Sequence, residues 1–300
     1  MKKAIITFIT IFSAILVFST LYILINGNYL HFPGVYDEIR AVSLSSILQG
    51  ITGILLTLIS TLLIIYTIVD ANSKNEMVSI ENNVLKMIDY HRQNYEDIIK
   101  MDKDFFVFGF TILFKYKNVL EPIINDILSK DEKAVIKEIP EDEILDLSYL
   151  FYFFGYNSAF DNKILLFYNK REKKSLSEEN IKLISSNLQK YSNGTALVSS
   201  KYFRQMYNII QFIDEKDIQL KEKIRLSKLL RVQLSNQEQS LLFFNSISQV
   251  GYNWKKTRID KKIKYNYIER YNILRNISSE DLGKIDLKKY YPNLKLEHEL

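Results

Sequence analysis

Hydrophobic residues are distributed unevenly along this chain of 300 residues, with two long apolar runs near its start. The runs Ala4–Ile25 and Ile47–Val69 hold 22 and 23 residues, and neither contains an Asp, Glu, Lys, Arg or His. About 20 apolar residues in a helix span the hydrocarbon core of a bilayer, which is about 30 Å thick. We therefore predict two transmembrane helices joined in a hairpin, with spans at residues 4–25 and 47–69.

The first run follows Lys2 and Lys3, so a secretory signal peptide is the competing interpretation. The apolar core of a signal peptide usually holds about 7–15 residues and leads into a cleavage site made of small residues. This run is longer, and no such site follows Ile25. The pattern therefore favours an uncleaved span.

Positive charges flank the two runs unequally. Lys2 and Lys3 precede the first run and Lys74 follows the second, whereas residues 26–46 between them hold one basic residue, Arg40. Because basic residues collect on the cytoplasmic side of a membrane, we expect both termini in the cytoplasm and a two-span inner-membrane protein. The chain has no cysteine, which fits a reducing compartment.

One face of the second run carries small and hydroxyl side chains, which are Gly50, Gly53, Thr57 and Thr61. Small residues in one stripe let helix backbones approach closely in lipid. This stripe is expected to pack against the first span or against a second copy of the chain, as a homo-oligomer. Neither run has an ionisable group that could relay an ion, so a pore would require several copies.

Residues 71–300 show helical rather than strand periodicity. Apolar residues recur at helical spacing through Val78–Ile99 and again through Phe203–Ile213. Pro140 followed by three acids predicts the start of a helix. Gly155 predicts where that helix ends, after the aromatic-rich stretch Leu145–Phe154.

Two further helix starts are marked by their first residues. Ser177 and the two glutamates after it predict a helix that runs to about Tyr191. Ser235-x-x-Glu238 is a capping-box pattern, in which each side chain satisfies an N–H of the first turn. We therefore predict an all-α protein with a transmembrane hairpin at residues 1–70 and a helical cytoplasmic domain at residues 71–300.

Catalytic and metal-binding patterns are missing from the sequence. The three histidines, His31, His91 and His298, are far apart in the chain, and phosphate-loop, zinc-hydrolase, nucleophile-elbow and dinucleotide motifs do not occur. The acids at 141–143 and 178–179 stand at helix starts, where the helix dipole explains them. We therefore expect no enzyme activity, no metal and no cofactor.

Basic and aromatic residues are interleaved between Tyr252 and Arg275, and apolar residues recur there at helical spacing. The apolar residues are Ile259, Ile263, Tyr267, Tyr271 and Leu274. We predict a solvated helix whose apolar face lies in the core. Contact with an anionic membrane surface or with nucleic acid is the alternative for such a basic amphipathic segment.

Two sequence elements resemble one bacterial family. Tyr202–Asp214 reads YFRQMYNIIQFID and Leu230–Asn245 reads LRVQLSNQEQSLLFFN, and both are similar to elements of the AbiC-like phage abortive-infection proteins. Weaker similarities, among them SYLFYFFGYNSA at Ser148–Ala159, extend the resemblance over most of residues 77–297. Gln239 stands where the family usually has an apolar residue.

The resemblance implies antiphage defence, in which infection triggers death or growth arrest of the host cell, and it implies no defined chemistry. It also draws attention to polar residues within the two elements, which are Arg204, Tyr207, Asp214, Arg231, Gln233 and Asn245. These side chains either form a polar network that joins buried helices or bind a trigger. In the network, Asp214 would pair with one of the two arginines, Arg204 or Arg231, because buried charge has to be paired and hydrogen-bonded.

From the resemblance and the apolar runs we expect an abortive-infection effector held in the lipid bilayer. Its helical domain would sense infection through a phage-derived or co-encoded protein, and its hairpin would compromise the membrane or growth. A membrane-tethered scaffold or signalling adaptor without membrane-damaging activity is the alternative. Nucleic acid is a disfavoured partner, because the chain offers no acidic metal cluster of the kind nucleases use.

Overall fold

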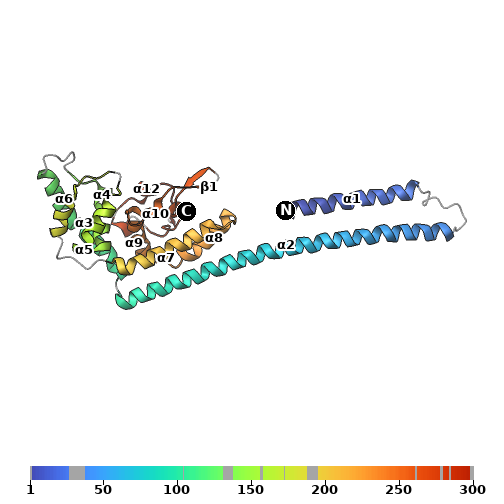
Figure 1. Ribbon diagram of the computed structural model, residues 1–300, viewed down its shortest axis with the longest axis horizontal. Coiled ribbons are helices and arrows are strands. Elements are labelled where there is room, and N and C mark those ends of the chain that lie inside the picture. The colour runs from blue at the N-terminus through green and yellow to red at the C-terminus, as the bar shows by residue number, and fades with distance from the viewer. Residues whose placement is uncertain are drawn as a thin grey trace. The chain divides into compact units, whose positions relative to one another are not determined.

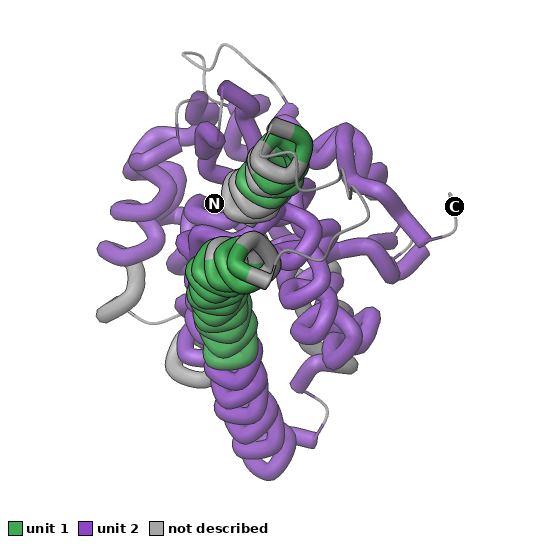
Figure 2. Tube along the Cα trace, turned by 90° about the vertical axis from the view of Figure 1, so that its right-hand side faces the viewer, with its two compact units in different colours: residues 1–80 green, residues 81–300 purple. Residues whose placement is uncertain are grey.

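A computed structural model of the chain describes residues 2–26, 38–103, 105–130, 138–155, 158–171, 173–187, 195–260, 262–277, 280–283 and 285–297. The chain divides into two compact units, Met1–Ile80 and Glu81–Leu300 (Figure 2).

Almost all regular structure among the described residues is helical (Figure 1). The helices up to residue 187 are α1 (Lys2–Asn26), α2 (Glu38–Met101), α3 (Phe105–Lys130), α4 (Glu141–Phe154), α5 (Ser158–Tyr168) and α6 (Glu178–Asn187). The later elements are α7 (Ala196–Glu215), α8 (Leu220–Arg231), α9 (Asn236–Ile247), α10 (Tyr252–Lys255), β1 (Arg258–Asp260), β2 (Ile263–Tyr265), α11 (Tyr267–Tyr271), η1 (Glu280–Leu282) and α12 (Leu287–Tyr290). The predicted all-α class fits this arrangement.

Helix α2 is continuous from the first unit into the second (Figures 1 and 2). Its segment Gln49–Met101 contains an exposed apolar window that is long enough to cross a membrane, judged by length and composition alone. The apolar part of α1 is shorter, Thr10–Tyr22. Among the described residues one helix, rather than two, meets the requirements for a span, so the predicted two-span hairpin is not confirmed.

Helices α4 and α9 form the centre of the second unit. Every residue from Glu143 to Phe154, and every residue from Glu238 to Ile247, is buried. A helix that is covered on all sides lies inside a core rather than at its surface. Both helices pack against α3 and against each other, which explains why their sequences are rich in aromatic and aliphatic residues all round.

The helix ends predicted from the sequence are confirmed where the structure describes them. Pro140 is the N-cap of α4, and Gly155 closes the helix with φ 71°, a backbone conformation that favours glycine. In the capping box, Glu238 N donates to Ser235 Oγ at 3.2 Å, and Ser235 N donates to Glu238 Oε2 at 2.8 Å. The predicted extension of α6 to Tyr191 lies outside the described residues.

The two predicted amphipathic stripes are also confirmed. In α2, Val84, Ile88 and Ile98 are buried. In α7 the buried residues of the stripe are Phe203, Met206, Ile210 and Ile213. Apolar spacing of three and four residues therefore identified the face of each helix that the core covers.

The helix predicted between Tyr252 and Arg275 is wrong. Helix α10 ends at Lys255, and β1 and β2 then form an antiparallel hairpin in which Arg258 pairs with Tyr265. Ile259 and Ile263 are 70% and 68% exposed. The helical spacing of the apolar residues did not predict the fold here because contacts between the hairpin and α7, described below, hold this segment in an extended conformation.

Candidate functional site

A buried hydrogen bond joins the two sequence elements of the family resemblance. Tyr202 of α7 donates its hydroxyl to Glu238 Oε1 of α9, and both side chains are buried. The other carboxylate oxygen of Glu238 accepts from Ser235 N at 2.8 Å and from Ser235 Oγ at 2.7 Å. Burial, together with the Glu238 carboxylate, raises the pKa of Tyr202 well above its usual value. The capping-box glutamate thus caps α9 and also fixes α7.

Gln239, the departure from the family pattern, satisfies backbone groups inside the core. Its side chain is fully buried, its Nε2 donates to Leu234 O at 3.3 Å, and its Oε1 accepts from Asn276 N at 3.2 Å. An apolar residue at this position would leave the Leu234 carbonyl and the Asn276 N–H without their side-chain partner.

Asp214, at the end of α7, receives hydrogen bonds from two tyrosines. Tyr265 and Tyr271 donate their hydroxyls to its carboxylate at 2.9 and 2.5 Å. Arg270 Nε lies 4.0 Å from the same carboxylate, and its guanidinium also pairs with Asp260. Burial, and the bond to Asp214, raise the pKa of Tyr265 to about 12. The arginine beside Asp214 is thus Arg270 rather than Arg204 or Arg231, the two that the sequence elements offered as its partner; Arg231 instead donates to Asn272 O.

Tyr207 is a second residue of α7 that contacts the β-hairpin, through Arg258 of β1. Its hydroxyl accepts from Arg258 Nη2 at 2.9 Å, and its ring lies edge-on to Trp254 with centroids 5.5 Å apart. The guanidinium of Arg258 also lies 3.5 Å from the centre of the Tyr267 ring, a cation–π contact. Tyr207 and Asp214 are seven residues apart in α7, about two turns, and therefore lie on the same face of the helix. Both contact residues of the segment between Arg258 and Tyr271.

The other four predicted residues do not join Tyr207 and Asp214 in one site. Arg231 is buried and donates Nη1 to Asn272 O at 3.2 Å, and Asn245 is buried and donates Nδ2 to Tyr149 Oη of α4 at 2.9 Å. Arg204 and Gln233 are exposed. The six residues therefore lie in several separate contacts.

The small-residue stripe predicted for the membrane segment faces open space. No described residue comes within 4 Å of the positions that side chains at Gly50 and Gly53 would occupy. The hydroxyls of Thr57 and Thr61 donate to their own helix, to Gly53 O at 2.9 Å and Thr57 O at 2.8 Å. Gly53, Thr57 and Thr61 line an apolar groove with Leu58 and Leu62.

A second polar site, which no pattern in the sequence predicted, is a pocket of about 640 Å³ between α4, α10 and the segment after α5. We call it the basic pocket. Among the described residues that line it, four are cationic, Lys170, Arg171, Lys173 and Lys255, and one is a carboxylate, Asp142.

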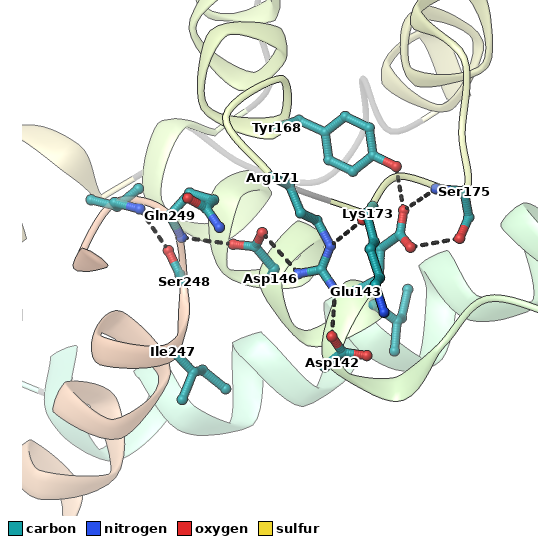
Figure 3. Close-up of polar contacts among 12 residues, drawn as sticks. Asp142, Glu143, Asp146, Tyr168, Arg171, Lys173, Ser175, Ile247, Ser248 and Gln249 are labelled. Atoms are coloured by element: carbon teal, nitrogen blue, oxygen red, sulfur yellow. Dashed lines mark hydrogen bonds and ion pairs between the residues drawn. The ribbon is translucent and has the colours of Figure 1, made fainter. Parts of the chain in front are cut away.

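Arg171 is held at the wall of the basic pocket by two acids of α4 (Figure 3). Its Nη2 lies 2.5 Å from Asp142 Oδ2 and its Nη1 lies 3.6 Å from Asp146 Oδ2, while its Nε donates to Lys173 O at 2.9 Å. Asp146 Oδ1 accepts from Gln249 N, just after α9, at 3.0 Å. Burial raises the pKa of Asp146 to about 6 even though Arg171 favours the carboxylate.

Glu143 holds the segment after α5, which carries Lys170 and Lys173, against α4 (Figure 3). This carboxylate is 1% exposed and accepts from Ser175 N at 2.8 Å, from Ser175 Oγ at 2.6 Å and from the Tyr168 hydroxyl. The helix-dipole explanation was therefore incomplete for Glu143, whose main contacts are with α5 and the segment after it. An acid in the first turn of a helix that is apolar all round was the sequence signal for this burial.

Comparison with known protein families identifies the part of the chain that carries the family resemblance. A family model described as "Putative phage abortive infection protein" matches residues 196–282. This range contains both sequence elements and runs from α7 to η1, so the resemblance is confirmed there. No curated protein and no solved structure matches the chain. From α7 to η1 the chain is therefore similar to the phage abortive-infection proteins, and this likeness suggests a role in abortive infection.

Proposed function

We propose that this protein is a membrane-anchored, non-enzymatic effector of phage abortive infection. The observation that carries the proposal is the family match at residues 196–282. The exposed apolar window of α2 supports a membrane location. In this proposal α1 is a second span, both termini are cytoplasmic, and the helical domain responds to infection.

The continuity of α2 supports a route from the helical domain to the membrane. Within the second unit, Glu81 of α2 accepts two hydrogen bonds from Arg225 of α8, at 3.0 and 2.8 Å. His91 packs against the ring of Tyr202 of α7, with centroids 4.5 Å apart. A change in the packing of α7 and α8 would therefore act directly on the helix that carries the apolar window.

The open groove at Gly53 supports assembly as the step that harms the host. Small residues that meet no described side chain leave room for a second helix in lipid. In the proposed mechanism the helical domain changes the packing of the membrane helices, copies associate through this groove, and the membrane barrier is lost.

A phage challenge tests the proposal. Cells expressing the full chain are infected, and plaque numbers, cell survival and a membrane-potential dye are followed together. We expect fewer plaques, early host death and loss of potential before lysis. Normal plaque numbers would contradict the defence role, and protection with an intact potential would contradict membrane damage.

Two membrane variants separate the effector from a tethered scaffold. Gly53→Leu fills the groove and should abolish protection without changing the amount of protein in the membrane, whereas Ile65→Leu, outside the groove, should protect normally. A scaffold would tolerate Gly53→Leu, and it would also tolerate replacement of the first 70 residues by an unrelated anchor.

A further inference from the structure

The basic pocket is lined by residues from inside and from outside the range that matches the family model. Lys255 and the residues after α9 lie within residues 196–282, while Asp142 and Lys170–Lys173 lie outside that range. Its volume of about 640 Å³ is within the range of small-molecule sites, roughly 300–1,000 Å³. Its walls come from α4, α10 and the segment after α5, and the hydrogen bonds of Asp146 and Glu143 hold these elements together.

We propose that the basic pocket binds a nucleotide, that is, a phosphorylated small molecule with an aromatic ring. Three lysines supply the charge for the phosphates. Lys170 and Lys173 are exposed at the rim, and Lys255 projects from α10 with its Nζ 2.8 Å from Ile247 O at the end of α9. Lysines at the wall and rim of one cavity of this size match the charge of a phosphate chain.

The aromatic ring of the ligand has partners in the same pocket. Tyr252 is 49% exposed at the pocket wall, and the half-buried ring of Phe167 also lines it. Lys170 Nζ already lies 4.6 Å from the centre of the Phe167 ring. Bases stack on such rings with little dependence on base identity. The side-chain amides of Gln249 and Asn253 line the wall as well and offer donors and acceptors to the edge of a base.

Binding of a phosphate would act on the structure through Arg171. A phosphate competes with Asp142 for the guanidinium, because both are anions that bond to the same nitrogens. Arg171 also contacts Asp146, whose other oxygen accepts from Gln249 N next to α9. The pocket is in this way linked to the end of α9, the helix whose start is fixed to α7 by Glu238 and Tyr202. That the nucleotide is the signal of infection rests on the proposed function, whereas the binding itself does not.

Binding is measured with the purified full chain in detergent, by calorimetry with the four ribonucleoside triphosphates, with inorganic phosphate and with a single-stranded RNA of about ten nucleotides. We expect one or more of the triphosphates to bind at one site per chain with a Kd below about 1 mM, tighter than phosphate by about tenfold or more. Lys170→Gln combined with Lys173→Gln should weaken this binding at least about tenfold, as should Tyr252→Ser. Lys182→Gln, an exposed lysine of α6, is the matched control and should bind normally.

The proposal is overturned if none of the triphosphates binds, or if the double lysine variant binds them as tightly as the wild type does. It is also overturned if inorganic phosphate binds as tightly as the triphosphates, or if the RNA binds and a triphosphate does not displace it. The phage challenge separates this inference from the proposed function. If the double lysine variant no longer binds but still protects, the nucleotide is not the signal and the defence role stands. If the wild type binds but does not protect, the defence role fails and the site stands.

Discussion

Removal of one hydroxyl tests whether the two family elements are joined as the structure shows. In Tyr202→Phe, the donor to Glu238 is lost while the ring and its packing remain. A hydrogen bond to a charged group contributes about 1.5–3 kcal/mol. Glu238 keeps its two bonds from Ser235, so it stays partly satisfied, and we expect a loss near the middle of this range, about 2 kcal/mol.

The assay is thermal unfolding of the full chain in detergent, followed by circular dichroism. In a domain of 150–250 residues, 1 kcal/mol shifts Tm by about 2–4 °C, so about 2 kcal/mol predicts a fall of about 4–8 °C. Tyr90→Phe is the control, because Tyr90 is 61% exposed on α2, and its Tm should change by about 1 °C or less.

A second measurement isolates the bond itself. In a cycle with Tyr202→Phe, Glu238→Ala and the double variant, the coupling energy should be about 2 kcal/mol. A Tyr202→Phe shift no larger than that of Tyr90→Phe, or a coupling energy near zero, would refute the role given to this bond.

Three further predictions follow from buried groups in the second unit. Gly251→Ala should destabilise strongly, by about 3 kcal/mol or more, because its Cβ would lie 2.0 Å from Asn245 O, and urea unfolding of the variant measures the loss. Burial lowers the pKa of His91 from 6.5 to about 4. Between these two pH values the unfolded chain binds a proton that the folded chain does not bind. The free energy of unfolding should therefore fall by about 3 kcal/mol as the pH drops from about 6.5 to 4. Arg231→Ala should lower the amount of folded protein, because the carbonyl of Asn272 loses the donor that buried Arg231 supplies, whereas Arg204→Ala should accumulate normally. Loss of phage protection in Arg204→Ala would then assign that exposed arginine to binding of a trigger.

The His91 prediction needs a comparison between variants, because Asp146 titrates in an overlapping range. The folded carboxyl of Asp146 takes up its proton near pH 6, above its unfolded value, which stabilises the folded chain as pH falls through the same window. His91→Leu removes the histidine contribution alone. Identical pH profiles of wild type and His91→Leu would contradict the assignment, and Gly251→Ala unfolding at the wild-type urea midpoint would contradict the close approach to α9.

Local patterns in the sequence were sufficient for most of the helices. The start of α4 at Pro140, its end at Gly155 and the capping box of α9 depend on residues within a few positions of each other. The same holds for the stripe of α7, whose buried residues repeat every three or four positions. The segment 258–265 was mispredicted because its apolar spacing also fits a helix, and only contacts with α7, some 51 residues away in sequence, select the hairpin.

The candidate site was less predictable than the helices for the same reason. Asp214 was identified as a buried acid in need of a partner, but its tyrosines lie 51 and 57 residues further along the chain, and periodicity carries no information about such pairs. Arg171 and Asp142, 29 residues apart, meet at a pocket that no local motif marks.

By itself, the sequence determined the apolar segment, the helical class and the caps, because these follow from the transfer of side chains into lipid and from hydrogen bonds within one turn. The tertiary structure alone decided which polar side chains are buried together, that Glu143 and Asp146 lie inside, and that Lys170, Arg171, Lys173 and Lys255 line the same cavity. Desolvation makes each buried charge depend on partners from distant elements, so these features exist only once the helices are packed.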